Sequence, residues 1–157
     1  MQIKLIAVGK TDHPAISQLI KEYTDRLGHY VRFDLEILPD LKNTKSFSEA
    51  VQKEKEGVLI LKKIAPADDL ILLDENGKSY SSLDFSMLLQ KKMNSGLKQL
   101  TFVIGGPYGF SEAVYERANG KLSISKMTFS HQMIRPFFIE QLYRSFTILR
   151  NEPYHHH

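Results

Sequence analysis

The chain contains no cysteine among its 157 residues, which excludes a disulfide, a cysteine-ligated metal site and a thiol nucleophile. Long apolar stretches are also lacking: no aliphatic run is longer than Leu70–Leu73, and Lys4 interrupts the apolar start. We therefore expect no transmembrane span and no signal peptide, and a reducing, cytoplasmic location. With 42% hydrophobic and 25% charged residues, the composition is typical of one globular domain, which we place over residues 1–157.

Acidic residues are scarce in the last part of the chain. Residues 98–157 contain 7 Lys or Arg against 4 Asp or Glu, whereas residues 1–97 contain 14 of each sign. The formal net charge of +3 therefore comes from the last sixty residues, which also hold four of the six His. An anionic partner would meet this part first, although a solvated surface with a chance excess of charge explains the same count.

Hydrophobic periodicity divides the chain into alternating strands and helices. The pattern predicts strands over residues 2–9, 31–37, 69–74, 99–104 and 121–125. It predicts helices over residues 12–28, 47–65, 82–94, 111–118 and 130–150, and a turn at 75–78. This alternation is typical of an α/β fold with a mostly parallel sheet and helices on both faces. No internal repeat or low-complexity linker divides the chain.

Ligands of open α/β sheets bind at the carboxyl ends of the strands. Four segments follow predicted strands here: Gly9-Lys10, Leu73-Asp74, 105–110 and 125–129. The glycine loop at 105–110 does not have the spacing of a dinucleotide or phosphate loop, and Pro107 removes one backbone N–H that a phosphate would need. A loop of small residues allows a ligand to lie flat against the backbone, which suits an adenosine without phosphates. Taken alone, the loop fits a tight strand-to-helix turn before Ser111 equally well.

Several motifs, in this order, resemble the ribosomal large subunit methyltransferase H family. They are Phe102-Val-Ile-Gly-Gly-Pro-x-Gly-Phe, Leu122-Ser-x-Ser-Lys-Met-Thr-Phe, His131-Gln-Met-x-Arg, Glu140-Gln-Leu-Tyr-Arg and Asn151-Glu-Pro-Tyr-His. The opening Ile6-Ala-Val-Gly-Lys and the Leu73-Asp-x-x-Gly-Lys segment fit the same family. The resemblance covers essentially the whole chain, and its C-terminal motifs are the most specific.

This family belongs to the SPOUT class of methyltransferases. The resemblance implies a SPOUT-type α/β knot, with a trefoil knot near the C-terminus, a homodimer, and S-adenosylmethionine as the methyl donor without a metal. It further implies methylation of N3 of a pseudouridine in helix 69 of 23S rRNA, of the position 1915 type, on assembled ribosomes. Knotted chains are rare, so the knot is expected from the resemblance alone.

Carried over residue by residue, the resemblance places the donor site on three strand-end segments. Leu73 and Ile124 would supply apolar walls for the adenine, and backbone groups of the other positions would bind its polar edge. Without the family, both residues would be read as strand core. The full set expected to bind the donor is Leu73, Gly105, Gly106, Ile124, Ser125, Lys126, Met127, Thr128 and Phe129.

Removal of the N3 proton calls for a base, which is typically worth about 10²–10⁴-fold in rate. Glu140, His131 and His155 are the candidates, and no single one is assigned. Glu140, Tyr143 and Arg144 share one helix face, which can present a carboxylate and a guanidinium together. The expected catalytic residues are Glu140, Arg144 and His155, and the expected substrate-binding residues are His131, Arg135, Tyr143 and Tyr154. Ion pairs within the helix or across a dimer interface are the alternative for both arginines.

Two features depart from the expected pattern. Pro136 falls inside the last predicted helix, which therefore starts later than Ser130 or kinks. The ending His155-His156-His157 replaces a mixed basic and acidic finish, so we interpret 155–157 as a flexible tail that includes the remnant of a purification tag.

Two other functions compete with the enzyme. One is a non-enzymatic ribosome-binding or assembly factor that keeps the fold without the donor site, and it is disfavoured because the donor motifs match without a gap. The other is a nucleotide-binding or hydrolase domain, which lacks a Gly-x-Ser-x-Gly motif, paired carboxylates and metal-ligand spacing.

Overall fold

A parallel five-stranded sheet forms the centre of the protein. In the computed structural model, which describes residues 1–42 and 44–155, the strand order is β2-β1-β4-β3-β5 and the pairs between neighbours are parallel. The strands are β1 (Gln2–Val8), β2 (Arg32–Leu38), β3 (Asp69–Ser79), β4 (Gln99–Ile104) and β5 (Gly120–Ser123). His156 and His157, to which the tag interpretation applies, lie outside the described residues.

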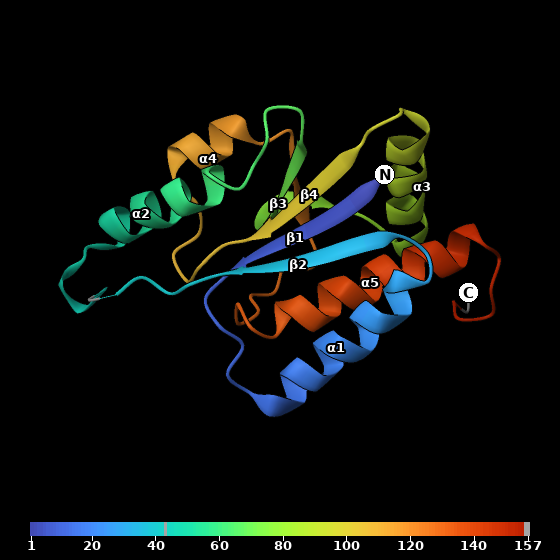
Figure 1. Ribbon diagram of the computed structural model, residues 1–157, viewed down its shortest axis with the longest axis horizontal. Coiled ribbons are helices and arrows are strands. Elements are labelled where there is room, and N and C mark those ends of the chain that lie inside the picture. The colour runs from blue at the N-terminus through green and yellow to red at the C-terminus, as the bar shows by residue number, and fades with distance from the viewer. Residues whose placement is uncertain (43, 156–157) are drawn as a thin grey trace.

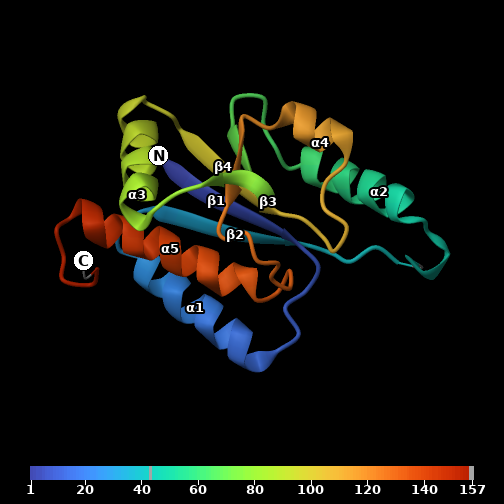
Figure 2. The same ribbon diagram turned by 180° about the vertical axis from the view of Figure 1, so that it is seen from behind.

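Helices cover both faces of the sheet, which confirms the predicted α/β architecture. On one face lie α1 (Pro14–Gly28), α3 (Ser82–Asn94) and α5 (Ile134–Leu149), with α5 packed against the other two. On the other face lie α2 (Glu49–Leu61) and α4 (Glu112–Arg117), preceded by a short 3₁₀ helix, η1 (Thr44–Ser46). Figures 1 and 2 show α2 and α4 on the side of the sheet opposite to α1 and α5.

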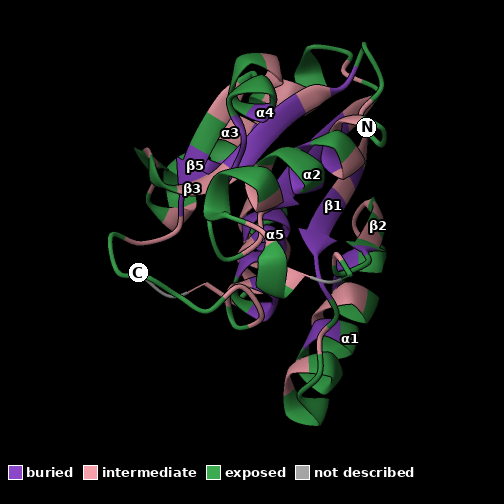
Figure 3. Ribbon diagram, turned by 90° about the vertical axis from the view of Figure 1, so that its left-hand side faces the viewer, coloured by how far each residue is buried: buried purple, intermediate pink, exposed green. Residues whose placement is uncertain are grey.

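Alternate side chains of the strands fill two hydrophobic layers. In β1, Ile3 and Leu5 belong to the layer under α1, α3 and α5, whereas Ile6 and Val8 belong to the layer under α2 and α4. Figure 3 shows that burial is concentrated in the strands and on the inner faces of the helices. Strands that are buried on both faces explain why the sequence has continuous apolar runs rather than alternation at β1, β3 and β4.

The segment 75–78 is not the chain reversal that the sequence predicts. Strand β3 continues to Ser79, and it pairs with Leu122 of β5 twice, first at Leu73 and again at Lys78. The intervening residues form a bulge, in which the Asn76 N–H donates to Asp74 Oδ1 at 2.8 Å. A Cβ at Gly77 would lie 2.6 Å from the backbone of Leu122, so only glycine fits there.

Helix α5 begins at Ile134 rather than at Ser130. Pro136 is its third residue, a position where the missing N–H would have no partner within the helix. Residues 131–133 form a turn that leads into α5, with the Met133 N–H donating to Ser130 Oγ at 3.1 Å. Of the two outcomes that Pro136 allowed, the late start is the one observed.

Helix α2 is also shorter than predicted, since it runs over 49–61 instead of 47–65. Ser48 is its N-cap residue, and the Ser48 hydroxyl accepts a hydrogen bond from the Val51 N–H at 3.3 Å. Across residues 1–42 and 44–155, no helix combines the length and hydropathy that a membrane crossing requires.

Candidate active site

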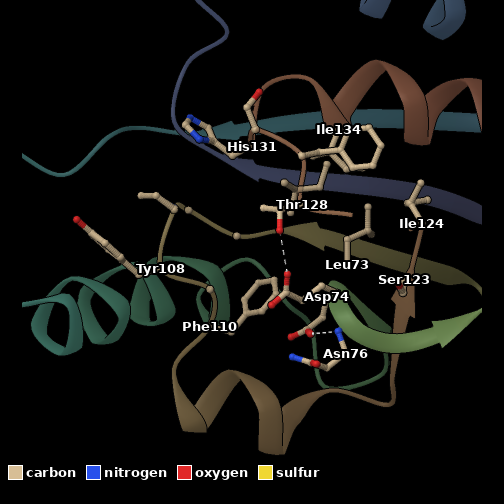
Figure 4. A pocket seen from close by; sticks show the side chains of 18 of the residues that line it. Leu73, Asp74, Asn76, Tyr108, Phe110, Ser123, Ile124, Thr128, His131 and Ile134 are labelled. Atoms are coloured by element: carbon tan, nitrogen blue, oxygen red, sulfur yellow. Dashed lines mark hydrogen bonds between the residues drawn. The ribbon is translucent and has the colours of Figure 1, made fainter. Parts of the chain in front are cut away.

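A cavity of about 720 Å³ opens at the carboxyl edge of the sheet. Three segments supply most of its lining: the end of β3 with its bulge, the loop after β4, and the chain from β5 to the first residue of α5. Glu49 of α2 and Tyr115 of α4 complete it. Figure 4 shows Leu73 and Ile124 toward one end of this cavity, and His131 and Tyr108 toward the other. The cavity therefore lies where the strand ends of an open α/β sheet converge.

Eight of the nine residues expected to bind the donor line this one cavity. They are Leu73, Gly105, Gly106, Ile124, Ser125, Met127, Thr128 and Phe129. Lys126 is the exception, and it is exposed next to them. Segments separated by up to 56 positions in sequence are thus brought together by the parallel pairing of β3 with β4 and β5.

The first two glycines of the loop have little or no room for a side chain. A Cβ at Gly105 would lie 3.0 Å from a ring carbon of Phe110, and a Cβ at Gly106 would lie 2.5 Å from Glu56 Oε2. Both positions therefore turn bare backbone toward the cavity, while Leu73 and Ile124 give it apolar walls. Apolar walls with backbone polar groups suit a flat, uncharged ring such as adenine.

A buried carboxyl group lies directly behind this loop. Glu56 is 4% exposed, and its Oε1 accepts a hydrogen bond from Gln52 Nε2 at 2.9 Å. Its Oε2 has no hydrogen-bond partner within residues 1–42 and 44–155. Burial, together with the nearby Asp40 carboxylate, raises the pKa of Glu56 and so favours its neutral form.

Sequence reasoning missed several polar residues of the cavity wall. Tyr115 donates to Asp74 Oδ2 at 2.5 Å, and Thr128 Oγ1 donates to Glu75 Oε2 at 3.4 Å. Burial and the bond to Asp74 raise the pKa of Tyr115 to about 12, so its hydroxyl stays protonated. The sequence places Asp74 at the end of a strand. It has no pattern that pairs Asp74 with Tyr115, because Tyr115 lies 41 residues further along the chain.

The two predicted substrate residues nearest the cavity have different environments. His131 lines the cavity, whereas Arg135 is fully buried. The Arg135 guanidinium donates to Val8 O at 2.7 Å, to Thr11 Oγ1 at 2.8 Å and to His131 O at 3.0 Å. This burial lowers the pKa of Arg135. It corrects the expectation of a cation that contacts the substrate: Arg135 instead fastens the end of β1 to the start of α5.

The remaining predicted residues form a separate group, the tail cluster, which consists of Glu140, Tyr143, Arg144, Tyr154 and His155. None of them lines the cavity of their own chain. Arg144 follows Ile134 by ten residues, which is about 15 Å along a helix axis. One chain therefore does not bring these residues together with the cavity.

Within the tail cluster, the Glu140 carboxylate accepts hydrogen bonds from several side chains. Its Oε1 accepts from Arg144 at 2.7 and 3.0 Å and from the Tyr154 hydroxyl at 3.1 Å, and its Oε2 accepts from Gln141 at 2.7 Å. The Arg144 guanidinium lies 4.7 Å from the Tyr154 ring centroid, and its Nη1 lies 3.5 Å from His155 Nδ1. With both oxygens engaged, the Glu140 carboxylate orients the side chains around it.

Comparisons with known proteins identify the family of the chain. A family model described as "Predicted SPOUT methyltransferase" matches residues 1–155. The protein named ribosomal RNA large subunit methyltransferase H of Flavobacterium johnsoniae is 69% identical over 156 residues, and that of Parabacteroides distasonis is 61% identical. Each alignment covers 99% of this chain and 99% of the relative.

Among solved structures, the chain is similar to the SpoU methyltransferase AviRb from Streptomyces viridochromogenes in complex with AdoMet. The TM-score is 0.47 at 12% identity, over 96% of this chain and 61% of that one. A probable methylase family protein from Haemophilus influenzae gives a TM-score of 0.48 at 14% identity, over 99% and 70%. From the family model and the full-length relatives, the chain belongs to the SPOUT methyltransferase family, in the group of the ribosomal RNA large subunit methyltransferases H.

Proposed function

We propose that this protein transfers a methyl group from S-adenosylmethionine to N3 of a pseudouridine in helix 69 of 23S rRNA, on assembled ribosomes in the cytoplasm. The observation that carries the proposal is the cavity in which Gly105 and Gly106 present backbone between the apolar walls of Leu73 and Ile124. The relatives' printed name supplies the class of substrate, ribosomal RNA of the large subunit. The trefoil knot stays a prediction that accompanies this assignment.

The proposed reaction joins N3 of the base to the methyl carbon and breaks the bond from that carbon to the sulfonium sulfur. The electron pair of the broken bond stays on sulfur, and the N3 proton leaves to a base. Because the donor already carries an activated carbon, the chain contributes mainly alignment of the two reactants. His131 at the cavity and His155 beside Arg144 remain the candidates for the base, while Glu140 orients Arg144 and Tyr154.

We also propose that the active form is a homodimer. Four apolar side chains on and before the start of α5 are exposed: Met127 (77%), Phe129 (38%), Met133 (39%) and Phe137 (45%). The cavity and the tail cluster lie apart in one chain, so a second copy can bring its tail cluster to this cavity. Burial of the exposed apolar side chains would stabilise such a pair. Light scattering at micromolar concentration should give the mass of two chains, and the mass of one chain would contradict the dimer.

The function is tested by calorimetric titration with S-adenosylmethionine, followed by methyl transfer from labelled donor to ribosomes that lack this methyl group. We expect one donor per chain, and label at N3 of the helix 69 pseudouridine by mass spectrometry. A net charge of +3 permits few phosphate contacts, so we expect little transfer to an isolated hairpin. A flat titration would favour a non-enzymatic ribosome-binding factor, and full activity on a short unmodified hairpin would contradict the proposed substrate.

A further inference from the structure

The C-terminal residues 151–155, here called the tail, fold back onto their own chain. Asn151 has φ +55°, a left-handed conformation that reverses the chain after α5. The Glu152 N–H then donates to Thr147 O, and the Tyr154 N–H to Glu152 O, both at 2.9 Å. The tail therefore has a defined path along the end of α5.

Residues of α1 and its following turn fasten the tail from the other side. The Tyr30 hydroxyl donates to Glu152 Oε2, and the Arg150 guanidinium lies 4.5 Å from the Tyr30 ring centroid. The bond to the Glu152 carboxylate raises the pKa of Tyr30 to about 12. The charged acceptor makes this one of the stronger hydrogen bonds a neutral hydroxyl can form.

A second link joins Tyr23 to the tail. Its hydroxyl lies 3.4 Å from the Tyr154 hydroxyl. Since Tyr154 donates its single proton to Glu140, Tyr23 is the donor in this pair. The Tyr143 ring lies among the other three, with centroid distances of 6.0 Å to Tyr23, 5.7 Å to Tyr30 and 4.7 Å to Tyr154. Burial and these hydroxyl contacts raise the pKa of Tyr154.

We propose that Tyr23, Tyr30 and Glu152 are positioning residues, which hold Tyr154 and His155 in the orientation that methyl transfer requires. This inference rests on the proposed function, because it assigns the tail to the rRNA side of the reaction. None of the three lines the donor cavity, so their effect reaches the reaction through the tail. Because a small misplacement of a reacting group costs a large factor in rate, fixing the tail before the ribosome binds favours turnover.

The test compares Tyr23→Phe, Tyr30→Phe and Glu152→Ala with the unaltered full-length protein, in steady-state methyl transfer to ribosomes and in donor titration. We expect kcat to fall about tenfold for Tyr30→Phe and Glu152→Ala and about threefold for Tyr23→Phe, with an unchanged Kd for the donor. Glu152→Gln keeps an oxygen that can accept from Tyr30, so it should recover most of the activity lost in Glu152→Ala. Tyr80→Phe, which removes a hydroxyl outside this group, is the matched control and should leave kcat unchanged.

Hydrogen exchange of residues 151–155 gives a readout on the tail itself, and it should speed up in Tyr30→Phe and Glu152→Ala. Equal losses of donor affinity and kcat would show a general structural role and overturn the inference. Unchanged kcat in all three variants, beside an active unaltered protein, would overturn the inference alone. An unaltered protein that binds the donor but methylates no ribosomes would refute the proposed function and this inference together.

Discussion

The cavity at the carboxyl edge of the sheet and the tail cluster at the far end of α5 use their polar groups in opposite ways. Behind the cavity's glycine loop, Glu56 Oε2 and Ser111 Oγ are buried without a partner within the described part of the chain. In the tail cluster, by contrast, the Glu140 carboxylate accepts hydrogen bonds from Arg144, Tyr154 and Gln141. Buried hydrogen-bonding atoms therefore lie unpaired behind the glycine loop, whereas the Glu140 carboxylate in the tail cluster has partners on both oxygens.

This difference separates two tasks. At the glycine loop, the cavity is bounded by bare backbone opposite the apolar side chains of Leu73 and Ile124, which leaves space for a ligand. The tail cluster is shaped by directed bonds between side chains, which fix orientation before any partner arrives. Changes at the cavity should therefore act first on donor binding, and changes at the tail cluster should act on turnover.

The largest effect is expected from Gly106→Val. The new side chain begins 2.5 Å from Glu56 Oε2, in a buried place where the carboxyl cannot move into water. Overpacking of this kind costs roughly 1–3 kcal/mol, and here it pushes the loop into the donor's space. Calorimetric titration with S-adenosylmethionine should become flat.

Two variants sharpen this prediction. Gly28→Ala is a matched control, because a Cβ there meets nothing within 4 Å and the residue lies far from the cavity at the end of α1. It should bind the donor normally. Gly106→Ala should bind weakly, and adding Glu56→Ala should restore part of the affinity by vacating the contested space. No recovery in the double variant would show that the clash with Glu56 is not the cause.

The next largest effect is expected from ending the chain after Pro153, which removes residues 154–157 and with them Tyr154 and His155. Turnover on ribosomes should fall by about 100-fold, the scale associated with a misplaced reacting group. The donor Kd should change by less than about twofold, since neither residue lines the cavity. Donor titration and single-turnover assays on the same preparation measure the two effects separately. Equal losses of donor affinity and turnover would show that the cavity and the tail cluster do not have separate roles.

The smallest effect is expected from Glu56→Gln, on stability. Below a pH of about 4.3 the carboxyl is protonated in both the folded and the unfolded chain, so it adds no penalty. As the pH rises, the carboxyl ionises first in the unfolded chain, because its pKa is raised in the folded one, so the wild type loses stability. The variant should therefore gain on the order of 1 kcal/mol over the wild type at pH 8, and nothing at pH 4. Urea unfolding at both pH values measures this, and a constant difference would contradict the sign.

The sequence predicted the regions that local pattern controls. Apolar and alternating runs predict the strands, and the rule that ligands bind at strand ends points to Leu73 and to the 105–110 loop. The bulge at 74–77 could not be predicted, because it depends on pairing with Leu122, which lies far along the chain. The burial of Arg135 escaped for the same reason, since its acceptor at Val8 is 127 residues away.

The resemblance to a family supplied the tail residues, but it could not show that they lie apart from the cavity in one chain. That separation depends on the length of α5 and on where the tail turns back, and both are properties of the assembled fold. Glu140 was a candidate base through the resemblance, and local spacing only placed it on one helix face with Arg144. The sequence could not show that one of its oxygens accepts from both Arg144 and Tyr154.

The hydrogen bonds of Arg135 to Val8 and Thr11 also bear on the order in which parts of the fold form. Its guanidinium holds the loop after β1, yet it is encoded near the other end of the chain, and the segment 122–134 that closes the cavity precedes it directly. The hydrogen bond from Arg135 to Val8 at the end of β1 can therefore form only after most of the chain has been synthesised. Contacts of such long sequence separation form slowly. The cavity is consequently complete only once residues up to Ile134 are in place, so an incomplete chain lacks part of its lining.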